Sequence, residues 1–465
     1  MSVLVGRTLG LQLLTAGVTV VLARLLTPSD YGLFAVALAV QLVGQRAAEM
    51  GLPAALVRME ETPSRQLQAA IGGVLLVTST ALATLLLLAA FALAPAVGGS
   101  RTLEVIAIAG CAIPLYAARS MPMVLMEREL RFGRVAIVET ADTLAFNGFA
   151  IAAALAGLGV FSLAGAVPAG GLAGVLTAWA IQPFARRPSL DLDPVRPLAG
   201  FGLRVSALQG IYLLRELGFV VMVAAIGGAP VAGFYAMAKR LFSFPIALTS
   251  AVGRVSFPAL SRDAALRPSR AAKVATYTAI AAGLPLALVA GAIQPLIGVV
   301  LGQEWMPTAE VVLLGSLGMM LTASANATMI SFALAEGRPN GPLISAIAET
   351  AVAFAAVAAL TGPLGEVGVG LAITLSTVMA TIALAITTHP LVRRSLLGVA
   401  KASLIAAAAA GVAQLTGVAN DFTGLAISLG IVSAIWLALE LLFSRGDLTR
   451  IVQLTRPLLR RTAAA

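Results

Sequence analysis

Uninterrupted apolar runs of about 20 residues recur along the whole chain, each long enough to cross roughly 30 Å of hydrocarbon as an α-helix. Of the 465 residues, 59% are hydrophobic and only 11% are charged, whereas a water-soluble domain carries about 25% charged residues. The runs lack the period-two alternation of a membrane β-barrel. The sequence therefore predicts an all-α polytopic membrane protein.

Turn residues and charges divide the runs into about fourteen predicted transmembrane helices. Their expected limits are 2–24, 31–57, 66–94, 103–125, 134–157, 160–184, 203–226, 231–254, 273–298, 306–335, 340–360, 366–388, 396–416 and 422–443. The longest loops between them, 185–202 and 255–272, leave no room for a soluble catalytic domain. The chain has one histidine and one cysteine, and we expect that cysteine, Cys111, to be a small core residue. We therefore predict no enzyme, with no catalytic residue, no cofactor and no metal site.

Lysine and arginine gather on one side of the predicted membrane. With the N-terminus in the cytoplasm, 23 of them fall in cytoplasmic loops or in the tail, and only Arg24 and Arg101 fall outside. This asymmetry predicts that both termini are cytoplasmic. The net charge of +10 is spread over short loops, so we expect no nucleic-acid partner.

A polar turn, Thr27-Pro28-Ser29-Asp30, separates the first two apolar runs. Thr27 is suited to cap the second helix, Pro28 to occupy its first position, and Asp30 to face the positive end of its dipole. We therefore expect a tight hairpin on the outer face of the membrane.

This hairpin has an echo later in the chain. A shift of 201 residues places GLFAVA at 32–37 on GFYAMA at 233–238. Farther on, Glu139-Thr140-Ala141 matches Glu349-Thr350-Ala351 at a shift of 210 residues. Repeats that lie six helices apart keep the same orientation in the membrane, so these are parallel repeats.

The repeats predict two pseudo-symmetric six-helix lobes. We expect an N-terminal lobe at 1–199, a C-terminal lobe at 200–390, and two further helices with a basic cytoplasmic tail at 391–465. Two such lobes facing one another would form a central cleft suited to alternating access.

Several segments resemble a known family. LARLLTPSDYGLFAVALA at 22–39 and MGLPAALVR at 50–58 are similar to the opening of bacterial polysaccharide transporters. MVLMERELRFGRVA at 123–136, LGQEWMPTAEVV at 301–312 and ALAEGRPN at 333–340 are similar to later parts of the same family. These are the lipid-linked oligosaccharide flippases (Wzx-type) of the multidrug/oligosaccharidyl-lipid/polysaccharide exporter superfamily.

The resemblance implies a protein of the bacterial inner membrane. Its expected substrate is an undecaprenyl-pyrophosphate-linked oligosaccharide, moved to the periplasmic leaflet for exopolysaccharide, O-antigen or capsule biosynthesis. The expected partners are this glycolipid and the membrane lipids. Polysaccharide polymerase machinery is a candidate partner, and H⁺ or Na⁺ is left open as a coupling ion.

Ionisable residues at membrane depth are costly and usually face a cavity or a partner. Five cations are expected there, on four predicted helices: Arg46, Arg119, Arg215, Lys239 and Arg240. Because arginine can grip phosphate oxygens with two parallel bonds, we interpret this set as the substrate-binding cations of a central cavity. The alternative is a set of structural ion pairs that tie helices together.

Five carboxylates are expected at comparable depth: Glu49, Glu139, Asp142, Glu216 and Glu349. They would either couple transport to an ion or compensate the arginines. Glu49 lies three residues after Arg46, on one helix face, so the two are expected to pair. Glu216 is adjacent to Arg215 and should point another way, so we expect no mutual neutralisation there.

Two other functions remain as alternatives. The first is a cation-coupled small-molecule exporter of the multidrug type, in the same superfamily. Such exporters usually rely on acidic residues in the first helix, and the first predicted helix here has none. The second, a membrane glycan polymerase, needs a sizeable outer loop, and every predicted outer loop is short.

Overall fold

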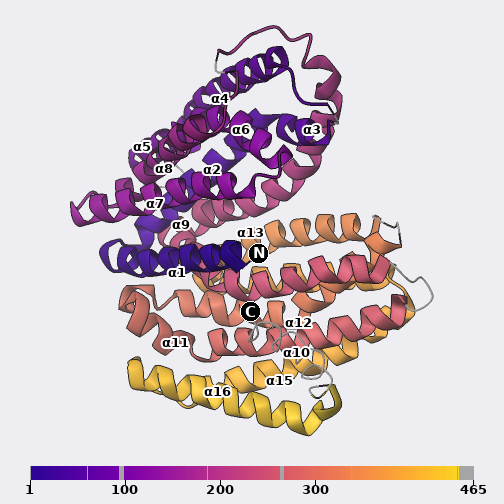
Figure 1. Ribbon diagram of the computed structural model, residues 1–465. Helices are drawn as coiled ribbons and strands as arrows, with labels where there is room; N and C mark the ends of the chain where they lie inside the picture. The colour runs from indigo at the N-terminus through magenta and orange to yellow at the C-terminus, as the bar shows by residue number, and fades with distance from the viewer. Residues whose placement is uncertain are drawn as a thin grey trace. The chain divides into compact units, whose positions relative to one another are not determined.

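The structure is a computed structural model that describes residues 2–59, 61–93, 99–185, 187–261, 267–336, 338, 340–447 and 449. Throughout these ranges the ordered elements are helices, and none of the described residues lies in a strand (Figure 1). The chain divides into two compact units, Met1–Ala236 and Met237–Ala465.

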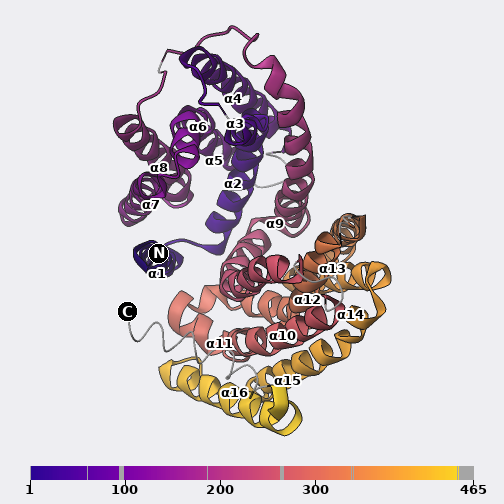
Figure 2. The same cartoon turned by 45° about the vertical axis from the view of Figure 1, so that its right-hand side comes forward.

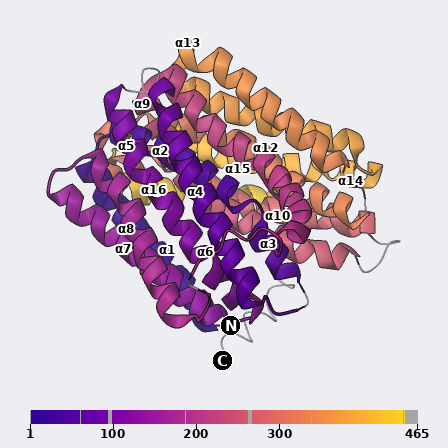
Figure 3. The same cartoon turned by 90° about the horizontal axis from the view of Figure 1, so that it is seen from above.

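The first unit is a bundle of helices. They are α1 (Ser2–Leu25), α2 (Pro28–Glu49), α3 (Leu52–Arg58), α4 (Arg65–Leu93), α5 (Ser100–Gly110), α6 (Ala112–Arg128), α7 (Phe132–Leu155), α8 (Val160–Ile181) and the part of α9 (Arg196–Ser261) before Met237. Helix α7 packs along α8, and α2, α4 and α6 lie beside one another (Figure 3).

The second unit continues with the rest of α9. It contains α10 (Arg267–Gly291), α11 (Ile293–Leu296), the π-helical stretch Ile297–Leu301, the 3₁₀ turn Gln303–Trp305, α12 (Thr308–Ala335), α13 (Asn340–Thr387), α14 (Pro390–Arg394), α15 (Leu396–Leu415) and α16 (Phe422–Phe443). Helix α10 packs on α12 and α15, and α16 lies against α15 and α10 (Figure 2).

Every predicted span falls on a described helix. Eleven helices are long and apolar enough to cross a membrane, and the described apolar part of α1 is a shorter stretch, Leu14–Leu25. The other two spans follow from breaks inside α9 and α13. The backbone leaves the helical region at Gly228 (φ 83°, ψ 173°) and at Gly365 (φ 57°, ψ −128°), where glycine has no Cβ to oppose a positive φ. Both breaks lie where the sequence predicts turns.

Three predicted spans are interrupted where continuous helices were expected, and one of them is 273–298, which stops at Ala292 between α10 and α11. The span 31–57 stops at Met50 (φ 48°) and Gly51 (φ 65°) before α3 begins. The span 103–125 is divided at Cys111 into α5 and α6. Pro114 explains the break at Cys111, because a proline has no N–H to donate to the carbonyl four residues earlier and its ring crowds that turn.

The hairpin between α1 and α2 has the predicted cap. The Thr27 side chain accepts a hydrogen bond from the backbone N–H of Asp30 at 3.2 Å, and the Asp30 carboxylate accepts from the N–H of Thr27 at 3.1 Å. Pro28 opens the helix. This reciprocal capping box satisfies two donors that would otherwise lack partners at the helix start. Arg101, which the charge count assigns to the same side, lies 3.8 Å from the Asp30 carboxylate.

The predicted repeat produces a reciprocal helix crossing inside the first unit. A Cβ added to Gly32 would lie 1.8 Å from the carbonyl oxygen of Ala229, and one added to Gly233 would lie 1.9 Å from the carbonyl oxygen of Pro28. Gly32 and Gly233, like Pro28 and Ala229, are separated by 201 residues, which is the shift of the repeat. The two equivalent helix starts therefore cross backbone to backbone, which only glycine permits at both points.

The cores are rich in small residues. In the second unit, alanines of α10 and α15 such as Ala279, Ala287, Ala402 and Ala409 are buried in one continuous cluster with Trp436. Small side chains allow helices in a membrane to approach closely, where van der Waals packing replaces the hydrophobic effect. In α4 of the first unit, Leu85, Leu88 and Phe91 are exposed, as expected for a lipid-facing surface, whereas Ile71 and Leu75 nearer its start are buried.

Candidate functional site

A polar row runs along the second half of α2. Gln41 donates to the side-chain oxygen of Gln45, and Gln45 donates to Glu49, each over 3.4 Å. Arg46 lies 3.3 Å from the Glu49 carboxylate, so the predicted pairing is confirmed. The Arg46 side chain is 54% exposed, against 15% for Glu49. At the end of the row, the Arg46 guanidinium contacts Glu49, while much of the Arg46 side chain remains exposed.

The two glutamines of this row are absent from the sequence-based site. Gln41 is only 1% exposed, and Gln45 follows it by one helical turn. The spacing of 41, 45 and 49 places three hydrogen-bonding side chains on one helix face. That spacing was a usable signal, because buried amides in an apolar helix need partners.

Arg119 of α6 and Asp142 of α7 form an ion pair. Their side chains are 18% and 17% exposed, and the Arg119 guanidinium also lies 4.5 Å from the centre of the Tyr116 ring. Helix α8 makes room for the pair with two glycines. A Cβ at Gly174 would lie 2.6 Å from an Arg119 nitrogen, and one at Gly170 would lie 2.5 Å from an Asp142 oxygen. The pair joins α6 to α7 and packs against the glycine surface of α8.

Arg215 and Glu216 correct one expectation. The guanidinium of Arg215 donates to the Glu216 carboxylate at 3.0 Å, so these neighbours do neutralise each other. Successive residues leave a helix about 100° apart, but both side chains are long enough to bend toward a common point. Arg215 is 25% exposed and Glu216 is 44% exposed.

The other predicted site residues are spread over both units. Glu139 is exposed on α7 of the first unit, and Glu349 is half-buried on α13 of the second. Lys239 is exposed and Arg240 half-buried on the part of α9 that belongs to the second unit. Three of the predicted cations thus each form an ion pair with a carboxylate of the predicted set, in three separate pairs. That all five cations line one cavity stays a prediction.

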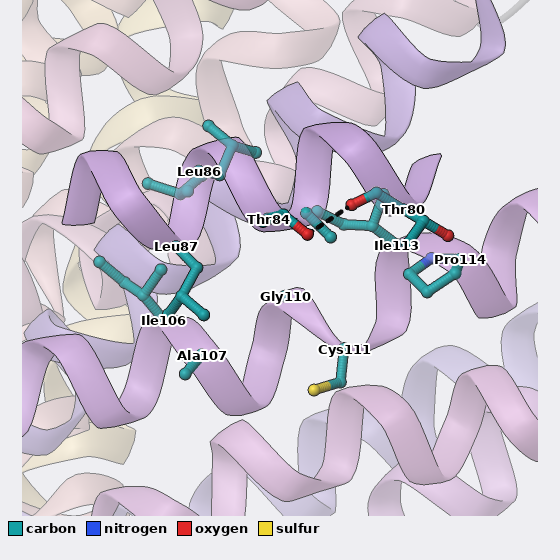
Figure 4. A pocket seen from close by; sticks show the side chains of 12 residues that line it. Thr80, Thr84, Leu86, Leu87, Ile106, Ala107, Gly110, Cys111, Ile113 and Pro114 are labelled. Atoms are coloured by element: carbon teal, nitrogen blue, oxygen red, sulfur yellow. Dashed lines mark hydrogen bonds between the residues drawn. The ribbon is translucent and has the colours of Figure 1, made fainter. Parts of the chain in front are cut away.

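An apolar cavity of about 380 Å³ lies among α2, α4, α5 and α6 (Figure 4). Leu86 and Leu87 of α4 and Ile106 of α5 line it, together with Thr84, whose hydroxyl bonds to a carbonyl of its own helix. Its wall also contains Cys111, which is exposed rather than buried, so the expectation of a core cysteine is wrong. A cavity with such walls suits a hydrocarbon chain, not a glycan.

Arginines in the predicted cytoplasmic loops cap helix ends. Arg128 donates to the carbonyl of Leu56, to that of Met59 at 2.8 Å and to that of Glu61 at 2.7 Å, which fixes the end of α3 to α6. Arg134 donates to the last carbonyl of α8, that of Ile181, at 3.1 Å. The basic residues of the 123–136 segment thus satisfy carbonyls that have no partner inside a helix. Among the described residues, no group of three or more histidine, cysteine or acidic side chains could hold a metal ion.

Comparison with known proteins places this geometry in a wider context. The model of a family described as polysaccharide biosynthesis protein matches residues 21–310. The succinoglycan biosynthesis transport protein ExoT of Rhizobium meliloti (strain 1021) is 24% identical over 306 residues, which are 64% of this chain and 60% of ExoT. The aligned part therefore spans less than two thirds of that relative.

Two solved structures share the fold. The lipid II flippase MurJ in an inward closed conformation has a TM-score of 0.76 and 14% identity, over 96% of this chain and 99% of MurJ. An inward-facing multidrug resistance transporter of the MATE family, in the MOP superfamily, has a TM-score of 0.60 and 14% identity, over 88% of this chain and 96% of that one. The predicted all-α polytopic membrane fold is confirmed, and these relatives are transporters, not enzymes.

Proposed function

The chain belongs to the polysaccharide biosynthesis protein family, and on that premise we propose that it is a flippase for lipid-linked oligosaccharides. Its substrate is an undecaprenyl-pyrophosphate-linked oligosaccharide that serves cell-surface polysaccharide biosynthesis. The two lobes, 1–199 and 200–390, expose a cationic cavity alternately to the two leaflets of the bacterial inner membrane. Both termini lie in the cytoplasm.

One observation carries the proposal: a chain of this family shares its fold with a lipid II flippase over 96% of its length. That protein, as its name states, is a flippase of lipid II. The family description and the succinoglycan relative supply the class of polymer. The cargo that satisfies both is a lipid-linked unit of a surface polysaccharide.

The side chains support a division of roles among the predicted cations. Arg119 and Arg215 are each held by a carboxylate, so their charges are compensated, and the Arg119–Asp142 pair also ties α6 to α7. Arg46 keeps more than half of its side chain exposed while Glu49 orients it. An exposed and oriented guanidinium in an apolar helix is suited to grip a pyrophosphate. We assign Arg46, Lys239 and Arg240 to the glycolipid.

The paired carboxylates favour compensation over ion coupling. Glu49, Asp142 and Glu216 each contact an arginine, so each carboxylate balances the charge of a guanidinium. Membrane lipids and the polymerase machinery that receives the flipped unit are the proposed partners.

The test is translocation by the full-length protein in liposomes that contain a fluorescent polyprenyl-pyrophosphate oligosaccharide. Glycan reaching the opposite leaflet becomes accessible to an added glycosidase, which gives the rate. We expect wild-type protein to accelerate this exposure and Lys239→Ala/Arg240→Ala to slow it about tenfold, the effect of losing roughly 1.4 kcal/mol of binding to the moving phosphate. Arg393→Ala/Arg394→Ala, an equally charged adjacent pair in a predicted cytoplasmic segment, is the matched control and should move the substrate normally. Failure of the wild-type protein to accelerate exposure would refute the proposed function.

Because the chain shares its fold with a MATE transporter, cation-coupled export of small molecules is the alternative function. That function predicts ion-driven efflux of cationic dyes from the same liposomes. The absence of any aspartate or glutamate from α1 argues against it. Dye efflux without glycolipid movement would favour the exporter.

A further inference from the structure

Helix α16 buries a single narrow face. Gly424, Ser428, Val432, Trp436 and Glu440 follow one another at intervals of four residues, and all five are buried. The rest of the helix is largely exposed, with only 22% of its span buried. Because residues four apart lie on one side of a helix, this row forms the centre of the face that α16 turns toward α10 and α15. The last member of the row is a carboxylic acid.

Glu440 has an unusual environment for a carboxylic acid. Its side chain is 0% exposed, and neither carboxylate oxygen makes a hydrogen bond to a residue that the structure describes. The side chain of Ser444, one turn later, lies near the carboxylate. Burying an ionised carboxylate that lacks strong partners is unfavourable. The neutral, protonated form avoids most of that cost.

Two charged side chains lie close enough to influence the ionisation of Glu440. They are Lys401 of α15 and Asp447 in the segment after α16. Helix α10 also packs against α16. It carries Arg270, Lys273 and Tyr277, and none of these three influences the ionisation of Glu440. Asp447 is acidic and opposes ionisation of its neighbour. Lys401 is therefore the group that decides whether the ionised form can exist.

Lys401 is occupied elsewhere in this structure. Its ammonium group donates to the backbone carbonyl of Phe443, near the end of α16. That carbonyl belongs to the last turn, where carbonyls lack partners inside the helix and attract cations. The lysine thus has two acceptors within reach on one helix end, the Phe443 carbonyl and the Glu440 carboxylate.

We propose that Glu440 is a proton-binding site, and that Lys401 moves from the Phe443 carbonyl to the carboxylate when the proton leaves. In the protonated state Glu440 is neutral and Lys401 caps α16. On deprotonation the proton passes from the carboxyl oxygen to water, and the ammonium group follows the new negative charge.

A proton fits this site better than a sodium ion. A sodium ion needs several oxygen ligands. Among the described side chains, Ser444 provides one hydroxyl near Glu440. The nearby ammonium group would also repel a second cation. The site lies in α15 and α16, outside the two lobes of the proposed flippase, so it goes beyond that function and does not depend on it.

Dicyclohexylcarbodiimide provides the test, because it modifies protonated carboxyl groups in apolar surroundings. Full-length protein in liposomes is treated between pH 5 and pH 9, and each adduct is quantified by mass spectrometry of peptides. We expect Glu440 to react at least about tenfold faster at pH 6 than Glu49, the control carboxylate, which is partly exposed and is held by Arg46. Sodium ions should give no protection.

The variant Lys401→Met separates the proposal from simple burial. Without the ammonium group the ionised form loses its partner, so the pH midpoint of labelling should rise by about one unit or more. An unchanged midpoint, protection by sodium, or absence of the Glu440 adduct from folded protein would each overturn the proposal. Labelling needs no transport, so its outcome is independent of whether the protein moves a glycolipid.

Discussion

The reciprocal crossing of Gly32 and Gly233 allows a quantitative prediction. Real Cβ atoms essentially never approach another heavy atom more closely than 3.0 Å, and the added Cβ atoms would lie 1.8 Å from the Ala229 oxygen and 1.9 Å from the Pro28 oxygen. Replacing Gly32 by alanine must therefore widen the crossing by at least 1.2 Å, and replacing Gly233 must widen it by at least 1.1 Å. The obstacle is a backbone carbonyl in both cases, so no side-chain rotation relieves it.

The energetic cost follows from this displacement. Overpacking in well-packed cores costs about 1–3 kcal/mol, and a backbone obstacle belongs at the upper end of that range. For a unit of this size each kcal/mol lowers the melting temperature by about 2–4 °C. Gly32→Ala and Gly233→Ala should therefore each lower it by roughly 6–12 °C. Because the geometry is nearly symmetric, the two losses should be similar.

The assay is thermal unfolding of the purified protein in detergent, followed by tryptophan fluorescence. Gly148→Ala is the matched control, since Gly148 lies inside α7 with nothing within 4 Å of an added Cβ. That change should be neutral or stabilising, because alanine favours a helix by about 1 kcal/mol over glycine. The double variant Gly32→Ala/Gly233→Ala should lose less than the sum, because one alanine has already separated the helices. If both single variants melt like Gly148→Ala, the close crossing is refuted.

Three further predictions concern single side chains. Arg119→Ala should lower the stability by about 3 kcal/mol, because it leaves the Asp142 carboxylate half-buried and unpaired, and the double variant Arg119→Ala/Asp142→Ala should recover part of that loss in thermal unfolding. Arg46→Ala should slow glycolipid translocation about tenfold. Arg196→Ala, which breaks a pair of equal length and spacing at the start of α9, should leave the rate unchanged; equal rates for the two variants would contradict the role of Arg46. Cys111, the single cysteine, should react with maleimide in the folded detergent-solubilised protein, and a thiol that reacts only after heat unfolding would contradict its exposure.

Local signals in the sequence predict much of the fold. Apolar runs, turn residues and the asymmetry of basic residues place every span on a helix, including both breaks at Gly228 and Gly365. The cap of Thr27 and Asp30 is predicted in detail, since its partners lie within one helical turn. The interruption at Cys111 is missed because a proline in a membrane helix is often tolerated by a modest bend.

The candidate site is less accessible to such reasoning. The Arg46–Glu49 pair is predictable because its spacing fixes a common helix face. The pairing of Arg119 with Asp142 joins two helices, and no spacing along the chain reports which face of α6 meets α7. Glu440 is overlooked because it lies near the end of an apolar run, where an acidic residue ordinarily reaches water.

The sequence by itself determines that this chain is a membrane protein, where most of its apolar helices lie, and that the stretch after its first hairpin is echoed 201 residues later. These properties depend on the length of apolar runs and on residues a few positions apart, so no distant contact is needed to establish them. Only the tertiary structure decides that the two copies of the hairpin cross at Gly32 and Gly233, that Arg119 is held by Asp142, and that Glu440 is buried. Those outcomes depend on which helix faces meet, and that choice is made by the packing of the whole bundle.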